Sequence, residues 1–167
     1  MSHTNTTYVI FDSDNDIWAY GYMKGWNKLE HVDFSFHDAH DLKPLSDRAE
    51  NEAYIKSRLR ERFGTAEQVI ILIGEDTRYL YKFVRWELET AQELNLPIIA
   101  VNLNDRRSFD ADRCPRLLYD EYVVHVPFQA KIIRYALDQF PCEYHRRDKM
   151  VGKNREYNSS VYSHLGL

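Results

Sequence analysis

The sequence has 167 residues, of which 44% are hydrophobic and 29% are charged, so it can form one sizeable hydrophobic core. Its formal net charge of −4 argues against a general nucleic-acid-binding protein, because such proteins neutralise phosphates with an excess of lysine and arginine. Residues 1–7 lack the basic and apolar regions of a secretory signal, and the strongest apolar run, Val69–Ile73, is too short to span a bilayer. We therefore expect a soluble, cytoplasmic protein that binds neither nucleic acid nor a membrane.

Five short apolar runs recur along the chain with helical segments between them. They cover residues 8–11, 32–36, 69–73, 98–103 and 122–126. The third and fourth are almost continuously apolar, as in strands covered by helices on both faces. The second alternates between apolar and polar residues, which indicates an edge strand. The pattern predicts an α/β fold of the flavodoxin-like, doubly wound type, with about five parallel strands.

Four helices are expected between and after these strands. Apolar residues three or four positions apart form the stripes of the last three: Ile55, Leu59 and Phe63; Val84, Leu88 and Ala91; and Ile132, Ile133, Ala136, Leu137 and Phe140. We expect the second helix to follow a capping pair, Asp47 and Glu50, and to end at Gly64. Pro127 is expected to open the last helix. The first helix, at about residues 16–24, has aromatic residues nearly all round.

The chain is expected to form one domain, residues 1–140, followed by a C-terminal extension, residues 141–167. Residues 104–121 form a long connection with one expected helical turn. In doubly wound sheets, ligands bind beyond the carboxyl ends of the strands, near the point where the strand order reverses. The chemistry is therefore expected in the loops after the first three strands and at the nearby helix starts.

The loop after the first strand has the sequence Asp12-Ser13-Asp14-Asn15-Asp16. It fits a polar turn that caps the next helix, and it also fits the rim of a ligand site. Clustered acids here suggest a phosphoacceptor receiver domain as well. That alternative is disfavoured, because the third strand is followed by Gly74-Glu75-Asp76 and offers no acceptor aspartate, and no lysine closes the fifth strand at Val126.

Glu87 is the residue that the third helix singles out. Glu89 is expected to pair with Arg85 four positions earlier. Glu87 has only uncharged residues three and four positions away, and it lies beside the apolar stripe of its helix. A carboxylate in the opening turns also stabilises a helix through its dipole, so position alone leaves catalysis and helix stabilisation both open.

No metal site is expected. His37 and His40 follow the second strand with acids nearby, but no third ligand stands at a recognisable spacing. Cys114 and Cys142 also lack metal-ligand spacing, and so low a cysteine content favours a reducing compartment over a disulfide. The sequence contains no nucleophile elbow, phosphate-binding P-loop or dinucleotide-binding glycine motif.

Several segments together resemble one family, the TIR-like proteins of the Thoeris anti-phage system (ThsB type). They are the first strand with its polar loop, the Val69–Gly74 strand with Thr77, and the block Lys82-Phe83-Val84-Arg85-Trp86-Glu87-Leu88. The resemblance covers roughly residues 7–140. Asp14 stands where the family commonly has an aromatic residue, and this departure bears on the pocket contacts and on the substrate or product isomer.

The resemblance implies an enzyme that cleaves NAD⁺ between nicotinamide and ribose and needs no other cofactor. The product would be a cyclic or conjugated ADP-ribose signal that activates a separate effector during phage infection. Glu87 would be the catalytic residue, and the family also implies a homo-oligomer. The residues expected to contact the nucleotide are Phe11, Asp12, Ser13, Asn15, Asp38 and Trp86, with Phe11, Trp18 or Trp86 as stacking walls.

Two other functions stay open at this point. TIR-like domains also act as non-catalytic interaction modules, which would be indifferent to a Glu87→Gln substitution. A nucleoside deoxyribosyltransferase-like enzyme also uses a glutamate on this architecture and would form a covalent glycosyl-glutamate intermediate.

Overall fold

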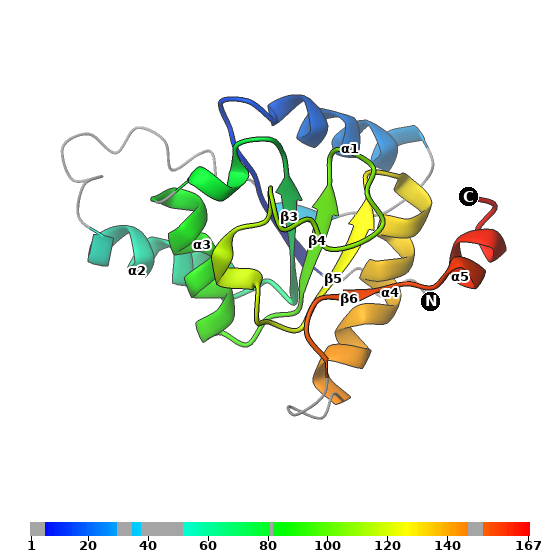
Figure 1. Cartoon of the computed structure of the whole chain (residues 1–167). Helices are drawn as coiled ribbons and strands as arrows, with labels where there is room; N and C mark the ends of the chain where they lie inside the picture. The colour runs from blue at the N-terminus through cyan, green and yellow to red at the C-terminus, as the bar shows by residue number, and fades with distance from the viewer. Residues whose placement is uncertain (1–5, 30–34, 38–51, 81, 147–151) are drawn as a thin grey trace.

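The chain forms a six-stranded, all-parallel sheet with the strand order β2-β1-β3-β4-β5-β6 (Figure 1). The computed structural model describes residues 6–29, 35–37, 52–80, 82–146 and 152–167. The strands are β1 (Thr6–Ile10), β2 (Ser35–His37), β3 (Gln68–Ile73), β4 (Ile98–Asn102), β5 (Val123–Pro127) and β6 (Arg155–Glu156). The helices are α1 (Ile17–Leu29), α2 (Glu52–Phe63), α3 (Phe83–Glu93), α4 (Ala130–Arg146) and α5 (Ser159–His164). Two 3₁₀ turns, η2 (Thr77–Tyr79) and η3 (Arg116–Leu118), lie in the connections.

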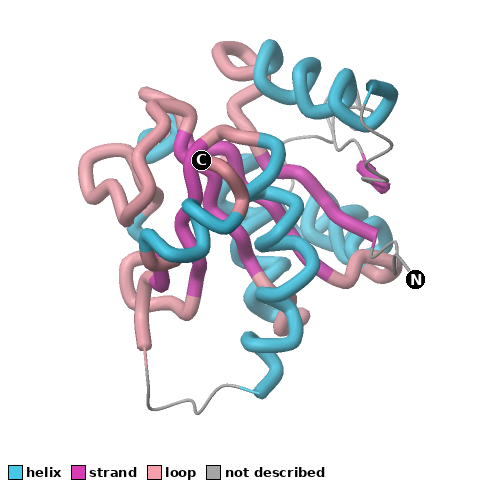
Figure 2. The backbone as a smooth tube through the Cα atoms, turned by 90° about the vertical axis from the view of Figure 1, so that its right-hand side faces the viewer, coloured by secondary structure: helices cyan, strands magenta, loops and turns pink. Residues whose placement is uncertain are grey.

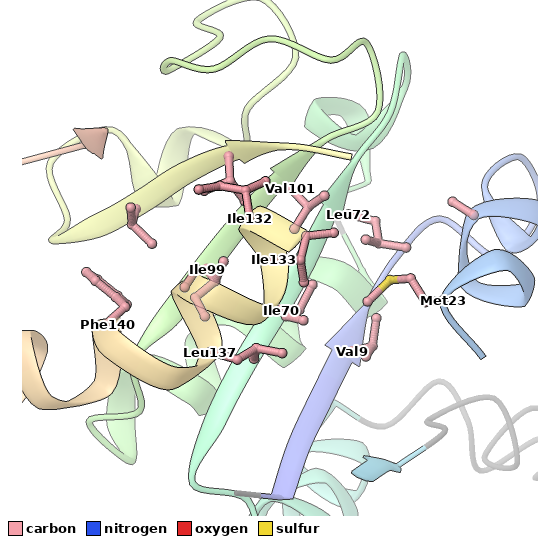
Figure 3. Close-up of a cluster of buried hydrophobic side chains, with 14 of the residues drawn as sticks. Val9, Met23, Ile70, Leu72, Ile99, Val101, Ile132, Ile133, Leu137 and Phe140 are labelled. Atoms are coloured by element: carbon pink, nitrogen blue, oxygen red, sulfur yellow. The ribbon is translucent and has the colours of Figure 1, made fainter. Parts of the chain in front are cut away.

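Helices cover both faces of the sheet and divide the core into two layers. All six residues of β3 are buried. Its side chains alternate, so Val69, Ile71 and Ile73 pack in the layer of α2 and α3, whereas Ile70 and Leu72 pack in the layer of α1 and α4. Figure 3 shows the second of these layers, with α4 residues lying over the sheet residues. This arrangement explains why the central strands are continuously apolar, and it confirms the predicted fold class.

The strand order shows where the chain reverses direction across the sheet. β1 pairs with β2 on one side and with β3 on the other, and β2 lies at the edge as predicted. The chain therefore moves outward from β1 to β2, crosses back to β3 and continues towards β5. Doubly wound proteins bind ligands in a crevice at such a reversal, beyond the carboxyl ends of the strands, so the carboxyl ends of β1 and β3 are where the crevice is expected.

The helix stripes are confirmed, because the predicted apolar residues of α2, α3 and α4 are buried. α1 runs to Leu29 and is longer than predicted. The expectation that Pro127 opens the last helix is wrong: it is the last residue of β5, where its missing N–H falls at the end of the ladder. Gly64 follows α2 directly, but its φ is not in the left-handed region that a glycine at a helix C-terminus often adopts. A left-handed φ is found after α3, at Asn95 (φ 53°). The proposed capping pair lies outside the described residues.

The C-terminal segment, residues 152–167, completes one side of the molecule. β6 adds a sixth strand, which the sequence does not predict because its two residues are charged and exposed. α5 packs its buried Tyr162 in the α1–α4 layer, and Figure 2 shows this helix against α4. α4 itself runs through residue 140, so the predicted domain boundary falls within a helix. The division into a domain and an extension stays a prediction.

Two further observations bear on the chain as a whole. No helix among the described residues has the length and apolar character needed to cross a membrane. Cys114 is buried, Cys142 is exposed, and both are free thiols.

Candidate functional site

The carboxyl ends of β1 and β3 meet at the reversal of strand order, and the loops that follow them form the candidate site. The first loop, residues 11–16, leads into α1 (Figure 1). The second begins at Gly74, contains η2 and precedes α3. α3 also contacts β1, so the helix that carries Glu87 lies beside the strand that carries the first loop.

Asp12 organises the first loop. Its side chain is buried, and its Oδ1 accepts hydrogen bonds from the backbone N–H groups of Asp14 (3.0 Å) and Asn15 (3.4 Å). The Asn15 amide donates to Asp12 Oδ2 at 2.8 Å, and the Asp16 N–H donates to the Asp12 carbonyl at 2.7 Å. Asp12, Ser13 and Asn15 therefore share one tight turn. Part of the polar character of this turn is structural, as expected for a turn that precedes a helix.

Asp16 is a candidate residue that sequence reasoning did not single out. Its side chain is 7% exposed, and its Oδ2 makes no hydrogen bond with any described residue. Burial, together with the nearby Asp12 and Asp76 carboxylates, raises the pKa of Asp16 to about 6, and Arg113 partly offsets this. Perturbed acids in a crevice are candidates for ligand binding. The sequence signal was the run of acids after β1, which gave no means of choosing among them.

Gly74 is what allows Asp16 to occupy this position. A Cβ atom at Gly74 would lie 2.1 Å from Asp16 Oδ2, so a larger residue would displace the carboxylate. The Gly74 N–H donates to Thr77 Oγ1 at 2.8 Å, which fixes the turn between β3 and η2. The absence of a side chain at Gly74 thus lets the Asp16 carboxylate, at the end of the first loop, lie directly against the residue that follows β3.

Glu87 is buried on α3, with 8% of its side chain exposed. It shares the inner side of the helix with Val84, Leu88 and Ala91, which have at most 4% exposure. Glu89 lies on another side of the helix and pairs with Arg85 at 2.8 Å, as predicted, and with Lys56 of α2 at 2.7 Å. Glu93, the third glutamate of the helix, pairs with Arg60 of α2. Glu87 therefore differs from both in lying among the buried apolar residues of α3, where low exposure strengthens the electrostatic effect of a carboxylate.

The predicted aromatic contacts divide between the two faces of the sheet. Phe11 packs in the α1–α4 layer and stacks on Tyr20 at a centroid distance of 4.8 Å. Trp86 packs in the α2–α3 layer next to Phe83. The two rings are core residues on opposite faces of the sheet. Trp18 is 48% exposed on α1.

The predicted site residues are thus brought together in part. Phe11, Asp12, Ser13 and Asn15 belong to the loop after β1, whereas Trp86 and Glu87 belong to α3. Asp38 lies outside the described residues. Among the described residues, no three His, Cys, Asp or Glu side chains are placed to hold a metal ion. What the arrangement offers chemically is buried carboxylates at a crevice, which stabilise positive charge.

A separate pocket lies near the amino ends of β4 and β5. Its lining includes Gln92, Asn95, Tyr122 and Tyr144, and it contains none of the predicted site residues. It lies at the edge of the sheet where ligands of doubly wound proteins do not usually bind.

Comparison with known proteins identifies a family. Residues 8–108, more than half of the chain, match the sequence model of the family described as "Thoeris protein ThsB, TIR-like domain". The matched region runs from β1 through β4 and contains the Asp12–Asp16 loop, Gly74 and Glu87. The elements β5, α4 and α5 lie beyond it. No curated protein matches the chain.

Proposed function

The chain belongs to the Thoeris ThsB TIR-like domain family, and from that premise we propose that it cleaves NAD⁺ between nicotinamide and ribose. The ADP-ribose part then becomes a cyclic or conjugated signalling nucleotide that activates a partner effector in anti-phage defence. We propose the cytoplasm as the site of this reaction, with NAD⁺ as substrate and no further cofactor.

The observation that carries this proposal is the burial of Glu87. An ionisable side chain that is 8% exposed on the inner side of α3 carries a desolvation cost that a purely solvated residue avoids. Enzymes keep such carboxylates where charge develops in the transition state. The helix that carries Glu87 contacts β1, which leads into the acidic loop at the crevice.

The reaction needs few protein groups. When the bond between ribose C1′ and the nicotinamide nitrogen breaks, its electron pair leaves with nicotinamide, and the cationic ring becomes neutral. A strong general acid is therefore unnecessary. The ribosyl centre becomes oxocarbenium-like, and the Glu87 carboxylate stabilises that charge or holds the ribose hydroxyls. Water or a hydroxyl group then attacks C1′ and releases one proton.

Charge at the crevice supports one orientation of the substrate. Asp12, Asp16 and Asp76 gather at the ends of β1 and β3, as their mutual effect on the Asp16 pKa indicates. Carboxylates repel the diphosphate of NAD⁺ and attract its cationic nicotinamide ring. We therefore place the nicotinamide end at this crevice, on the side of the bond that breaks.

The test compares small molecules from phage-infected cells that express the parent protein, Glu87→Gln or Glu89→Gln. We expect an ADP-ribose-containing species with the parent, none with Glu87→Gln, and the species retained with Glu89→Gln, whose carboxylate lies in a surface ion-pair network. Matched abundance and circular dichroism establish that all three are folded. Identical profiles for parent and Glu87→Gln would overturn the proposal and favour a non-catalytic interaction module. A glycosyl adduct on Glu87 would favour a deoxyribosyltransferase-like reaction.

A further inference from the structure

A third loop, the connection between β4 and β5, lies at the same end of the sheet as the loops after β1 and β3 (Figure 1). It covers residues 103–122 and carries four arginines, Arg106, Arg107, Arg113 and Arg116. The proposed function gives a place to the nicotinamide end of NAD⁺ but assigns no partner to the diphosphate. Arginine is well suited to that role, because its planar guanidinium can donate to two phosphate oxygens at once.

Arg113 differs from the other three arginines of this connection. Arg106 pairs with an aspartate of the same connection at 3.8 Å, and Arg107 lies over the ring of Tyr162 at 4.0 Å. Arg116 is exposed to solvent. Arg113 is half-buried, yet its guanidinium makes no hydrogen bond or ion pair with any residue that the structure describes. Charged groups with reduced exposure are normally paired, so this guanidinium is available to a ligand.

The backbone at Arg113 is held in a fixed turn beside the crevice. Asp110 Oδ1 accepts hydrogen bonds from the N–H groups of Asp112 at 3.0 Å and Arg113 at 3.3 Å. The Arg78 guanidinium, from η2, donates to the Asp112 carbonyl at 2.8 Å. This bond ties the residue before Arg113 to the loop after β3, and the first residue of that loop lies against Asp16. The third loop is therefore joined to the two loops of the candidate site.

Opposite charges come close at this crevice without neutralising each other by contact. The charge of Arg113 opposes the rise in the pKa of Asp16, so the two groups lie near each other. They form no ion pair, and Asp16 Oδ2 makes no hydrogen bond with any described residue. Such an arrangement suits a ligand that is cationic at one end and anionic at the other. The ribose at the scissile bond of NAD⁺ meets this requirement, because it carries nicotinamide at C1′ and the diphosphate at C5′.

We propose that the Arg113 guanidinium binds the diphosphate of NAD⁺, while the carboxylates at the ends of β1 and β3 face its nicotinamide ring. This inference rests on the proposed function and deepens it, because it assigns a second contact to the same substrate. Arg113 orients the ribose and takes no part in breaking the bond. The diphosphate stays on the ADP-ribose part when nicotinamide leaves, so the same contact holds that part while water or a hydroxyl group attacks C1′.

The test is an NMR titration of the full chain with three ligands, carried out in a Glu87→Gln background so that NAD⁺ is not consumed. The ligands are NAD⁺, ADP-ribose and nicotinamide riboside, which has the cationic ring and its ribose but no phosphate. We expect a further Arg113→Gln substitution to weaken the binding of NAD⁺ and of ADP-ribose about tenfold, since it removes charge-assisted hydrogen bonds. The binding of nicotinamide riboside should stay unchanged or become tighter, because Arg113 repels its cationic ring.

Two further variants separate the contact from general effects of charge and folding. Arg116→Gln removes the same charge from an exposed position of the same connection and should bind all three ligands like the Glu87→Gln chain. Arg113→Lys keeps the charge but loses the paired donors, so its affinity for ADP-ribose should be intermediate. Equal weakening of all three ligands by Arg113→Gln would show a structural role and overturn the proposal. Equal loss in Arg116→Gln would also overturn it, as would a Glu87→Gln chain that binds neither NAD⁺ nor ADP-ribose.

These affinities are measured without turnover, so failure of this proposal and failure of the proposed function are distinguishable. If infected cells make a Glu87-dependent signal but Arg113→Gln leaves the affinities unchanged, the diphosphate contact is wrong and the proposed function stands. If ADP-ribose binds through Arg113 but no Glu87-dependent signal appears, the contact stands and the proposed function is wrong.

Discussion

The Asp16 carboxylate lies against Gly74 beside two other acids, and this environment makes its ionisation unfavourable. Its pKa is raised from the ordinary value of 3.8 to about 6. The folded state therefore holds the Asp16 proton more tightly than the unfolded state does. This contribution to stability is fully present below pH 4 and is lost as the pH rises through 6. A residue kept at such a cost is a candidate for ligand binding, since active sites often trade stability for function.

We predict that Asp16→Asn stabilises the protein at pH 7.5 by about 1–3 kcal/mol, because the asparagine carries no charge to desolvate. The gain should shrink towards zero at pH 4, where the parent carboxyl is protonated. Urea unfolding of parent and variant at both pH values measures it. A stability difference that does not change with pH would show that the raised pKa is not the cause.

Gly74 provides a second test at the scale of single residues. We expect Gly74→Ala to lower the free energy of unfolding by about 1–3 kcal/mol, because its Cβ would lie 2.1 Å from Asp16 Oδ2 and must displace that carboxylate. In an Asp16→Ala background the clash is absent, so the cost should fall markedly. The four chains form a double-mutant cycle in urea unfolding. Additive costs would mean that the two residues do not interact.

The residue scale also shows the limits of the sequence. The loop after the first strand and Glu87 can be identified from strand position and helix spacing. The burial of Asp16 against Gly74 joins residues 58 positions apart in the chain, and neither spacing nor composition reports such a contact. The same limit applies to Phe11 and Trp86, which are both predicted to contact the nucleotide but lie on opposite faces of the sheet. The face on which each ring lies depends on how side chains alternate along β1 and on how α3 packs against the sheet, and spacing along the chain reports neither.

At the scale of elements, strongly patterned segments were predictable and weakly patterned ones were not. β3 and β4 are apolar except for one polar residue at an end of each, and the stripes of α2, α3 and α4 lie on a single side of each helix. β6 consists of two exposed charged residues, so no pattern marks it. α5 is a short helix whose buried residue is the single aromatic Tyr162. Because it has no longer apolar stripe, the sequence does not indicate where this helix packs.

We predict that this C-terminal element contributes to the stability of the whole domain. Tyr162 is 1% exposed in the α1–α4 layer, and the Arg107 guanidinium lies 4.0 Å above its ring. Tyr162→Ala should lower the free energy of unfolding by about 3–5 kcal/mol, as for other large buried aromatic residues. Ser163→Ala, a change at an exposed position of the same helix, serves as the control in urea unfolding. An equal effect of the two substitutions would mean that α5 is only loosely attached.

At the scale of the whole molecule, one polar cluster joins three distant segments. His125 of β5 is fully buried, and its Nε2 lies 2.8 Å from Asn154 Oδ1. The Asn154 amide donates to the carbonyl of Tyr119 at 2.6 Å, so Asn154 Oδ1 is the acceptor and His125 carries its proton on Nε2. The sheet, the connection that follows β4 and the C-terminal segment therefore meet at one hydrogen-bonded cluster, which fixes β6 at the sheet edge.

This cluster predicts an acid sensitivity opposite in sign to that of Asp16. Burial lowers the pKa of His125 below its ordinary value of 6.5, and the hydrogen bond with Asn154 offsets this only in part. The unfolded state therefore binds the His125 proton more tightly, so stability is fully present above pH 6.5 and falls as the pH drops towards the folded pKa. The slope should reach at most about 1.4 kcal/mol per pH unit.

His125→Gln isolates this effect when it is measured in an Asp16→Asn background, where the opposing titration is removed. Glutamine keeps an N–H donor for Asn154 but does not titrate, so the difference in stability between the two chains should change with pH only below 6.5. Urea unfolding between pH 5 and 8 measures that difference. A constant difference would mean that His125 has the same pKa in the folded and unfolded states. A difference confined to the acid side would establish that the C-terminal segment is joined to the sheet by a neutral histidine, so that acidification loosens one edge of the sheet while it relieves the charge repulsion at the crevice.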